Sequence, residues 1–143
     1  MRTDEPGRLV LLNHGSLRVA GERPEMSPNE LLPEAIELVG RGWTAAIVMR
    51  RGYGDSGGGF AEDRGSGQDP SYLRAAAAAV ADIKAASGFL AKRPDIDASR
   101  ILSIGVSPGG FATVALAADP PPGLVAGVSF AGGRGSDKPD EVP

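Results

Sequence analysis

The sequence predicts an α/β fold in which a parallel β-sheet lies between flanking helices, in three α/β/α layers. Apolar runs of strand length alternate with stretches of helical pattern, and glycines and prolines mark the joints between them. The strand-length runs are apolar throughout, which is typical of parallel strands that are buried on both faces. The length of 143 residues predicts one domain spanning residues 1–143.

The first half of the chain contains two expected strands and one expected helix. Leu9–Leu12 is a continuous apolar run that ends at "NHGS". Pro33–Val39 has apolar residues at helical spacing, with proline at the first position and Gly40 just past the end. Thr44–Met49 is the second strand, and the long glycine-rich loop "RRGYGDSGGGFAEDRGSGQ" follows it.

The second half opens with a long alanine-rich helix. Asp69 is its predicted N-cap, with Pro70 behind it, and the helix is expected to run to about Leu90. The remaining expected elements are a strand at Ile101–Ile104, a helix at Pro108–Ala118 and a strand at Val125–Phe130. Right-handed crossovers between such strands place the motifs "NHGS", "RRGYGDSGG" and "GVSPGG" together at the carboxyl ends, where α/β sheets bind ligands.

The composition excludes several classes of function. The net charge of −3 does not favour nucleic acid, the absence of cysteine excludes a thiolate metal site, and one histidine excludes a histidine cluster. We therefore expect no cofactor and no metal. The apolar runs are too short to span a membrane, so a soluble chain is expected: cytoplasmic as it stands, exported if a signal sequence precedes it.

"GVSPG" makes Ser107 the candidate nucleophile. It fits the pattern G-x-S-x-G between a strand and a helix, where Gly105 and Gly109 would allow the strained turn that exposes a serine hydroxyl. The alternative is that Ser107 only caps the following helix, with Pro108 at its first position.

Three motifs taken together resemble the α/β-hydrolases, and most closely their dienelactone hydrolase-like and acyl-peptidase-like branch. "LLNHGS", "RRGYGDSGG" and "GVSPGGFATVALAA" occur in the family's order and approximate spacing, and the resemblance covers about Leu9 to Gly133. It implies that the serine attacks the carbonyl of an ester, lactone or peptide-like substrate, either a small molecule or a peptide. It also implies that the "HG" loop supplies an oxyanion-hole N–H from Gly15 or Ser16.

The chain departs from this family at the residue after the serine. Pro108 has no N–H to donate, and losing one oxyanion donor typically costs ~10²–10³ in rate. Gly109 or the hydroxyl of Tyr53 could replace it, although for Tyr53 packing on the sheet edge is the preferred interpretation.

A second departure concerns the general base. The family's acid and histidine follow later strands, whereas the single histidine here, His14, precedes Ser107 and is interpreted as a structural anchor of the oxyanion loop. Asp137 and Asp140 are interpreted as solvated. We therefore expect a partial hydrolase domain that is weak or inactive alone, with strand order 4-3-5-6 of the family. The strand at Val125–Phe130 would then be an unpaired edge, open to self-association.

Two other functions stay open. A non-catalytic binding module of the same fold fits both departures. A dinucleotide-binding domain is suggested by "GYGDSG" at Gly52–Gly57, although no helix is expected to begin at its third glycine. Arg50 and Arg51 either bind an acidic substrate group or pair with carboxylates to anchor their loop.

Overall fold

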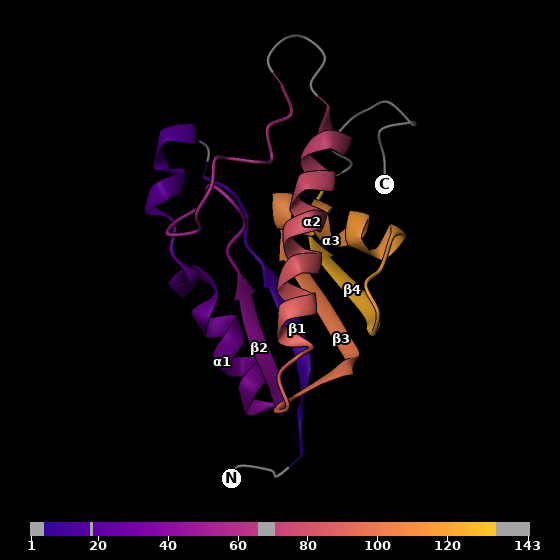
Figure 1. Cartoon of the computed structure of the whole chain (residues 1–143). Coiled ribbons are helices and arrows are strands. Elements are labelled where there is room, and N and C mark those ends of the chain that lie inside the picture. Colours follow the sequence, from indigo (N-terminus) through magenta and orange to yellow (C-terminus); the bar gives the residue numbers. More distant parts are fainter. Residues whose placement is uncertain (1–4, 18, 66–70, 134–143) are drawn as a thin grey trace.

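A four-stranded parallel sheet forms the centre of the computed structural model, which describes residues 5–17, 19–65 and 71–133. The strand order is β2-β1-β3-β4, and all neighbouring pairs are parallel (Figure 1). The strands are β1 Gly7–Asn13, β2 Trp43–Val48, β3 Ile96–Val106 and β4 Leu124–Phe130. This is the order that the 4-3-5-6 expectation requires, with β1 as the first of the four strands along the chain.

Helices cover both faces of the sheet, so the predicted three layers are confirmed. Helix α1 packs beside β2 on one face, while α2 and α3 pack against each other and the sheet on the opposite face (Figure 1). The helices are α1 Leu32–Gly40, α2 Tyr72–Leu90 and α3 Pro108–Ala118, and two 3₁₀ turns, Ala20–Glu25 and Pro28–Leu31, precede α1.

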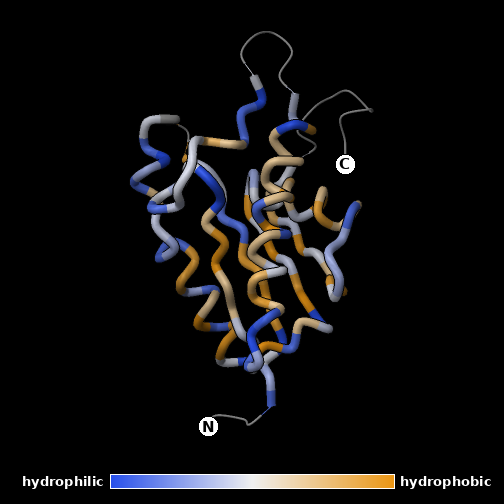
Figure 2. The backbone as a smooth tube through the Cα atoms, in the orientation of Figure 1, coloured by the Kyte–Doolittle hydropathy of each residue, from blue (hydrophilic) through white to orange (hydrophobic). Residues whose placement is uncertain are grey.

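The apolar run in β1 is explained by its position in the middle of the sheet. Leu9 and Leu11 belong to the core beneath α2 and α3, whereas Val10 and Leu12 belong to the core beneath α1. All four side chains are buried, because successive residues of a strand point to opposite faces and both faces are covered. Figure 2 shows this hydrophobic band running through the strands.

The expected elements all occur, and one predicted cap is wrong. Helix α3 has the bounds that the sequence predicts. Strand β2 is shifted by one residue from the expected Thr44–Met49, and β3 begins five residues before the expected Ile101. Asp69 and Pro70 lie outside the described residues. The N-cap of α2 is instead Ser71, whose side chain accepts a hydrogen bond from the Arg74 N–H at 3.3 Å, because serine serves an N-cap as well as aspartate.

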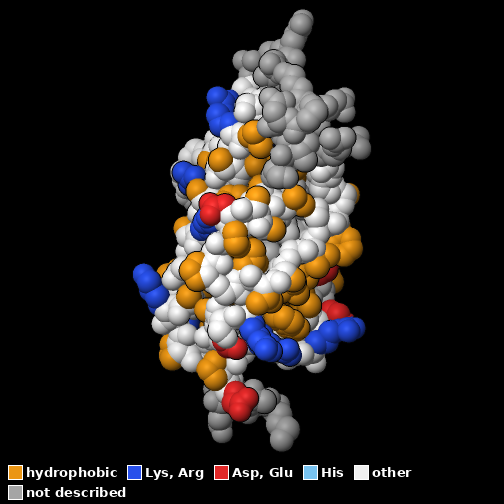
Figure 3. Space-filling model, turned by 90° about the vertical axis from the view of Figure 1, so that its right-hand side faces the viewer, with side chains coloured by type: hydrophobic (Ala, Val, Ile, Leu, Met, Phe, Trp, Pro, Cys, Tyr) orange, Lys and Arg blue, Asp and Glu red, His pale blue; other side chains and the backbone are white. Residues whose placement is uncertain are grey.

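Strand β4 is an edge strand with exposed apolar side chains, as predicted. Among the described residues it pairs only with β3, and Val125 and Phe130 are 62% and 58% exposed. Figure 3 views the molecule from the side on which β4 and α3 lie, and hydrophobic side chains are spread over that side. On the α1 face, an apolar groove of about 450 Å³ lies between α1 and the ends of β3 and β4, with Leu38, Ile104 and Phe130 in its lining.

The helices of the described residues include none that is both long enough and apolar enough to cross a membrane.

Candidate active site

Ser107 occupies a strained turn between β3 and α3. Its φ of 54° and ψ of −124° lie in a region that residues with a side chain rarely adopt. Such a conformation costs on the order of 1–3 kcal/mol, so the surrounding structure has to maintain it. The Ser107 N–H donates to the Phe130 carbonyl at 2.9 Å, and the Ser107 carbonyl accepts from the Phe111 N–H at 3.0 Å. These two bonds hold the turn against the end of β4 and the first turn of α3.

Two glycines allow the turn to be this tight, as the sequence predicts. A Cβ atom on Gly105 would overlap the carbonyl group of Gly109, and one on Gly109 would overlap the carbonyl oxygens of Asn13 and His14. Both glycines are buried. The turn after β3 therefore lies directly against the end of β1, which brings the "NHGS" and "GVSPGG" motifs into contact.

The Ser107 side chain does not cap α3. Pro108 is the first helical residue, as in the capping alternative, but Ser107 makes no side-chain cap hydrogen bond. The hydroxyl is instead on an exposed residue that borders a cavity of about 460 Å³. This geometry removes the main support for a purely structural role of the serine.

The cavity brings together side chains from all three motif loops. Ser16 follows β1, Tyr53 follows β2, and Ser107 and Pro108 follow β3. The other lining residues are Leu17, Arg23, Phe60, Glu62, Asp63, Arg64, Gly65, Tyr72, Ala75, Ala76, Ala79, Phe111, Ala112 and Gly132. Small alanines of α2 and the aromatic rings leave room for a ligand with an apolar part.

His14 is fully engaged by backbone groups. Its Nδ1 is 2.6 Å from the Gly15 carbonyl oxygen, and its Nε2 accepts the Arg50 N–H at 3.3 Å, which assigns the ring proton to Nδ1. The ring is 2% exposed and packs edge-on against Tyr53 at 4.6 Å between centroids. Burial, and then the positive charge of Arg50, lower the pKa of His14 to about 4, although the Gly15 contact opposes this.

The position of His14 agrees with the prediction made from the sequence. It lies at the carboxyl end of β1 beside the Ser107 turn, and the hydrogen bonds of the described residues include none between its ring and the Ser107 hydroxyl. A neutral ring whose Nε2 lone pair is already used by a backbone N–H cannot accept a proton from Ser107 in this arrangement.

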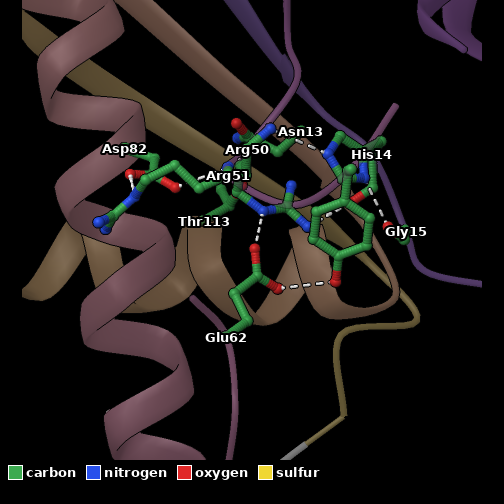
Figure 4. Close-up of polar contacts among 9 residues, drawn as sticks. Asn13, His14, Gly15, Arg50, Arg51, Glu62, Asp82 and Thr113 are labelled. Atoms are coloured by element: carbon green, nitrogen blue, oxygen red, sulfur yellow. Dashed lines mark hydrogen bonds and ion pairs between the residues drawn. The ribbon is translucent and has the colours of Figure 1, made fainter. Parts of the chain in front are cut away.

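A buried ion pair fixes the loop after β2. Arg50 is 0% exposed and its Nε pairs with Glu62 Oε1, while its Nη2 donates to the His14 carbonyl at 3.0 Å (Figure 4). The Tyr53 hydroxyl donates to Glu62 Oε2 at 3.2 Å, and it also interacts with the side chain of Ser16. Burial is the main cause that raises the pKa of Tyr53. The network ties the "HG" loop to the glycine-rich loop.

Both arginines of the "RRGYGDSGG" motif form ion pairs, so the anchoring interpretation holds for them in the structure. Arg51 pairs with Asp82 of α2 at 2.6 Å, and Arg50 pairs with Glu62. Neither belongs to the cavity lining. The dinucleotide interpretation loses its structural basis as well, because residues 58–65, which directly follow Gly57, form no helix, and the next helix of the described residues is α2 at Tyr72.

The predicted oxyanion residues differ in where they lie relative to Ser107 and the cavity. A Cβ atom on Gly15 would lie 3.6 Å from the Ser107 Cβ, so the backbone of the "HG" loop runs close to the serine. Ser16 and Tyr53 line the cavity. Gly109 packs against β1 and does not belong to the lining, so its observed place is in the frame of the turn.

Sequence reasoning missed Arg23, Phe60 and Glu62. Glu62 is the buried partner of Arg50, and the guanidinium of Arg23 lies 3.6 Å from the ring centroid of Phe60 at the cavity wall. A buried arginine requires a carboxylate partner, so the acids of the glycine-rich loop were the available signal for Glu62. Arg23 carries no comparable signal, because the segment after "NHGS" has no regular pattern.

Solved structures of two acetyl xylan esterases are similar to this chain. For the acetyl xylan esterase from Paenibacillus sp. R4, the TM-score is 0.53 and the identity 26%, over 80% of this chain and 37% of that one. For acetyl xylan esterase 1 from Thermoanaerobacterium sp. JW/SL YS485, the TM-score is 0.57 and the identity 20%, over 90% of this chain and 40% of that one. No protein-family model and no curated protein sequence matches the chain.

These likenesses identify the architecture. The four-stranded parallel sheet with its flanking helices is part of an α/β-hydrolase-like fold, and the structural similarity is to esterases of that fold. The chain spans about two fifths of the length of the solved proteins that it resembles.

Proposed function

We propose that this chain carries the nucleophile and oxyanion loop of a serine hydrolase that acts on an ester, lactone or peptide-like carbonyl. The observation that supports it most directly is Ser107: a non-glycine residue held at positive φ, with no side-chain cap bond, at the border of a 460 Å³ cavity. Strained backbone conformations of this kind cluster at active sites.

In the proposed reaction, Ser107 Oγ forms a bond to the substrate carbonyl carbon and the carbonyl oxygen takes the negative charge. The Oγ proton passes to a base, and the leaving alcohol or amine takes a proton as its bond to carbon breaks. Water then attacks the carbonyl carbon of the acyl-enzyme, and the bond from that carbon to Ser107 Oγ breaks, which releases the acid and returns the proton to Oγ. The backbone N–H of Gly15 or Ser16 is the proposed donor to the oxyanion, because their loop runs beside Ser107.

An ester is the favoured substrate class within this proposal. The two similar solved structures named above are acetyl xylan esterases by name, and the cavity has the apolar and aromatic walls that a small acyl or alcohol group would contact. Tyr53 is a weaker candidate for the second oxyanion donor, because its hydroxyl already donates to Glu62.

A non-catalytic binding module is the second candidate. It is favoured by Pro108, which has no N–H, and by His14, whose Nε2 is occupied by the Arg50 N–H. The sequence contains no histidine after Ser107, so the 143 residues hold a nucleophile without an evident base. Removing a triad member still leaves about 10³–10⁴-fold catalysis over water, so weak turnover is expected from these residues alone.

Self-association through β4 is a further part of the proposal. Its sequence, LVAGVSF, has no charge and no proline, the features that usually protect an edge strand, and within the part of the chain that the structure describes only β3 lies beside it. Sedimentation of the wild type and of Val125→Lys over a range of concentrations tests it, because the lysine should weaken any association that uses this edge.

Hydrolysis of p-nitrophenyl acetate by the 143-residue chain tests the catalytic proposal. Slow turnover that Ser107→Ala removes, while the buried-serine control Ser103→Ala retains it, would support a nucleophile at Ser107. Turnover that is unchanged in Ser107→Ala would contradict the proposal. Turnover at rates typical of complete hydrolases would show instead that these residues contain a base.

A further inference from the structure

Three buried polar side chains form a cluster behind the turn after β3 that takes no part in the ion-pair network. They are Asn13 of β1, Ser103 of β3 and Thr113 of α3, and each is 1% exposed or less. Asn13 Nδ2 donates to Ser103 Oγ at 2.9 Å and to Thr113 Oγ1 at 3.0 Å (Figure 4). The two hydroxyl oxygens lie 3.3 Å apart. The amide of Asn13 therefore joins two strands and a helix.

The amide of Asn13 is only partly satisfied by these bonds. Its Oδ1 is buried and has no hydrogen-bond partner among the described residues. A buried polar atom without a partner lowers stability, and an apolar side chain of similar size would avoid this loss. An amide provides what an apolar side chain does not, because its hydrogen bonds fix the direction in which the partner groups lie.

The two hydrogen bonds of Asn13 differ in what they join. Strands β1 and β3 are already paired through their backbones, so the bond to Ser103 adds little to their arrangement. Helix α3 has no such backbone pairing with β1. Among the described residues, the bond from Asn13 to Thr113 is the only hydrogen bond that links β1 or the loop after it to α3. The relative position of these two elements therefore depends on this bond and on packing.

The bond lies close to both reacting parts of the candidate site. A Cβ atom on Gly105 would lie 2.6 Å from Thr113 Oγ1, so the Thr113 hydroxyl is directly behind the turn that holds Ser107. Asn13 lies two positions before Gly15, whose backbone runs beside Ser107. The bond thus connects the strand that leads into the "HG" loop with the helix that begins directly after the serine.

Resting on the proposed function, we propose that Asn13 and Thr113 are positioning residues, whose hydrogen bond sets the spacing between Ser107 Oγ and the N–H donor of the "HG" loop. Acyl transfer needs both groups at once, since the donor has to lie about 2.7–3.1 Å from the oxyanion while Oγ bonds to the carbonyl carbon. A displacement of about 1 Å is enough to lower a rate by ~10²-fold. Without the bond, packing alone holds α3 against the end of β1.

The rate at which Ser107 reacts with a fluorophosphonate tests this proposal. Ser107 Oγ forms a bond to phosphorus as fluoride leaves and the Oγ proton passes to water, and the phosphoryl oxygen takes the place of the oxyanion. The rate therefore depends on the nucleophile and on the loop donor together. Thr113→Val keeps the shape of the side chain and removes its hydroxyl. We expect the maximal labelling rate to fall about tenfold, with little change in the half-saturating probe concentration, because alignment and not affinity is lost.

Ser103→Ala is the matched control, because it removes the other hydrogen bond of the same amide. It should label at the wild-type rate, whereas Thr113→Ser, which keeps the hydroxyl, should retain most of that rate. Asn13→Leu should slow labelling as Thr113→Val does, and the double variant should be no slower than either single variant, since both remove one bond. Thermal melting followed by circular dichroism shows that each variant is folded at the labelling temperature.

Equal labelling rates in Thr113→Val and Ser103→Ala would overturn the proposal, and so would a rate in Thr113→Ser as low as that in Thr113→Val. If Asn13→Leu does not fold, the variants at position 113 and Ser103→Ala decide the question by themselves. Absence of any adduct on wild-type Ser107 would overturn the proposed nucleophile and this inference with it. Labelling of Ser107 at one rate in all variants would overturn this inference alone.

Discussion

Two neighbouring regions of the site differ in how their polar groups are bonded. The first region consists of the loops after β1 and β2, and the second is the turn after β3. In the first region, His14, Arg50 and Tyr53 are buried and bonded to one another's backbone or to Glu62 (Figure 4). In the second, Ser107 is exposed, backbone-strained and without a cap bond. The polar groups of the first region therefore fix the conformation of the two loops. The Ser107 hydroxyl of the second region makes no cap bond and is accessible to a ligand.

This difference shows why residue type alone does not identify a catalytic group. His14 is chemically the better base, but its two ring nitrogens are committed and its pKa is lowered to about 4. A serine hydroxyl is the less reactive group in general, but Ser107 is the residue that the fold exposes at the cavity. The comparison predicts that the first region contributes to stability and the second to chemistry.

The largest expected effect is on stability, from Arg50→Met. The substitution leaves the Glu62 carboxylate buried without its partner, which typically costs about 3–5 kcal/mol, so much or all of the free energy of unfolding would be lost. Urea denaturation followed by circular dichroism measures it. Arg41→Met removes an exposed ion pair and is the control, with an expected loss of under about 1 kcal/mol. Similar losses in the two variants would contradict the anchoring role.

The second largest expected effect is a pH dependence of the free energy of unfolding, caused by the titration of His14. Its pKa is about 4 in the folded chain and near 6.5 unfolded, so the unfolded state binds more protons between these values. The contribution of His14 to the free energy of unfolding is fully present above about pH 6.5. It is lost as the pH falls towards 4, by roughly 3 kcal/mol in all.

Unfolding free energies measured at several pH values in wild type and His14→Gln check this. The difference between the two curves should grow smaller as the pH falls through this range. A constant difference would show that His14 titrates normally in the folded chain.

A smaller effect is expected on the rate, from Pro108→Ala. The alanine restores an N–H at the first position of α3 beside Ser107, and Gly105 and Gly109 still support the turn. Turnover of the 143-residue chain should change little, because a base is still missing. In a longer chain that contains a histidine after Ser107, the rate should change by up to ~10²-fold, measured as kcat on p-nitrophenyl acetate. An equal change in both chains would contradict this account.

The parts that could be predicted from the sequence are those that depend on local pattern. The apolar run of β1 indicated a strand buried on both faces, and "GVSPGG" indicated the turn, since its glycines are needed wherever backbones approach this closely. The motif order then placed three loops at one edge of the sheet.

The parts that could not be predicted depend on contacts between distant or irregular segments. The loop after β2 contains several acidic residues and no periodic pattern, so the sequence does not show which of them pairs with Arg50. The structure shows that the partner is Glu62. Arg23 lies in a 3₁₀ turn that has no sequence signature, so nothing in the sequence indicated that Arg23 lies at the cavity wall. The N-cap of α2 is Ser71 rather than Asp69, and the sequence offers both as adequate cap residues two positions apart.

Labelling by a fluorophosphonate probe is the most direct test of the central claim, that Ser107 and not His14 provides the chemistry of this site. Intact mass and peptide mapping of the wild type should show one slowly formed adduct, on Ser107, because the nucleophile is exposed but a base is missing, and no adduct in Ser107→Ala. His14→Gln, at a pH where it is folded, should label at a similar rate, because His14 is an anchor and not the base. Absence of any adduct on Ser107, or labelling that persists in Ser107→Ala, would contradict the account.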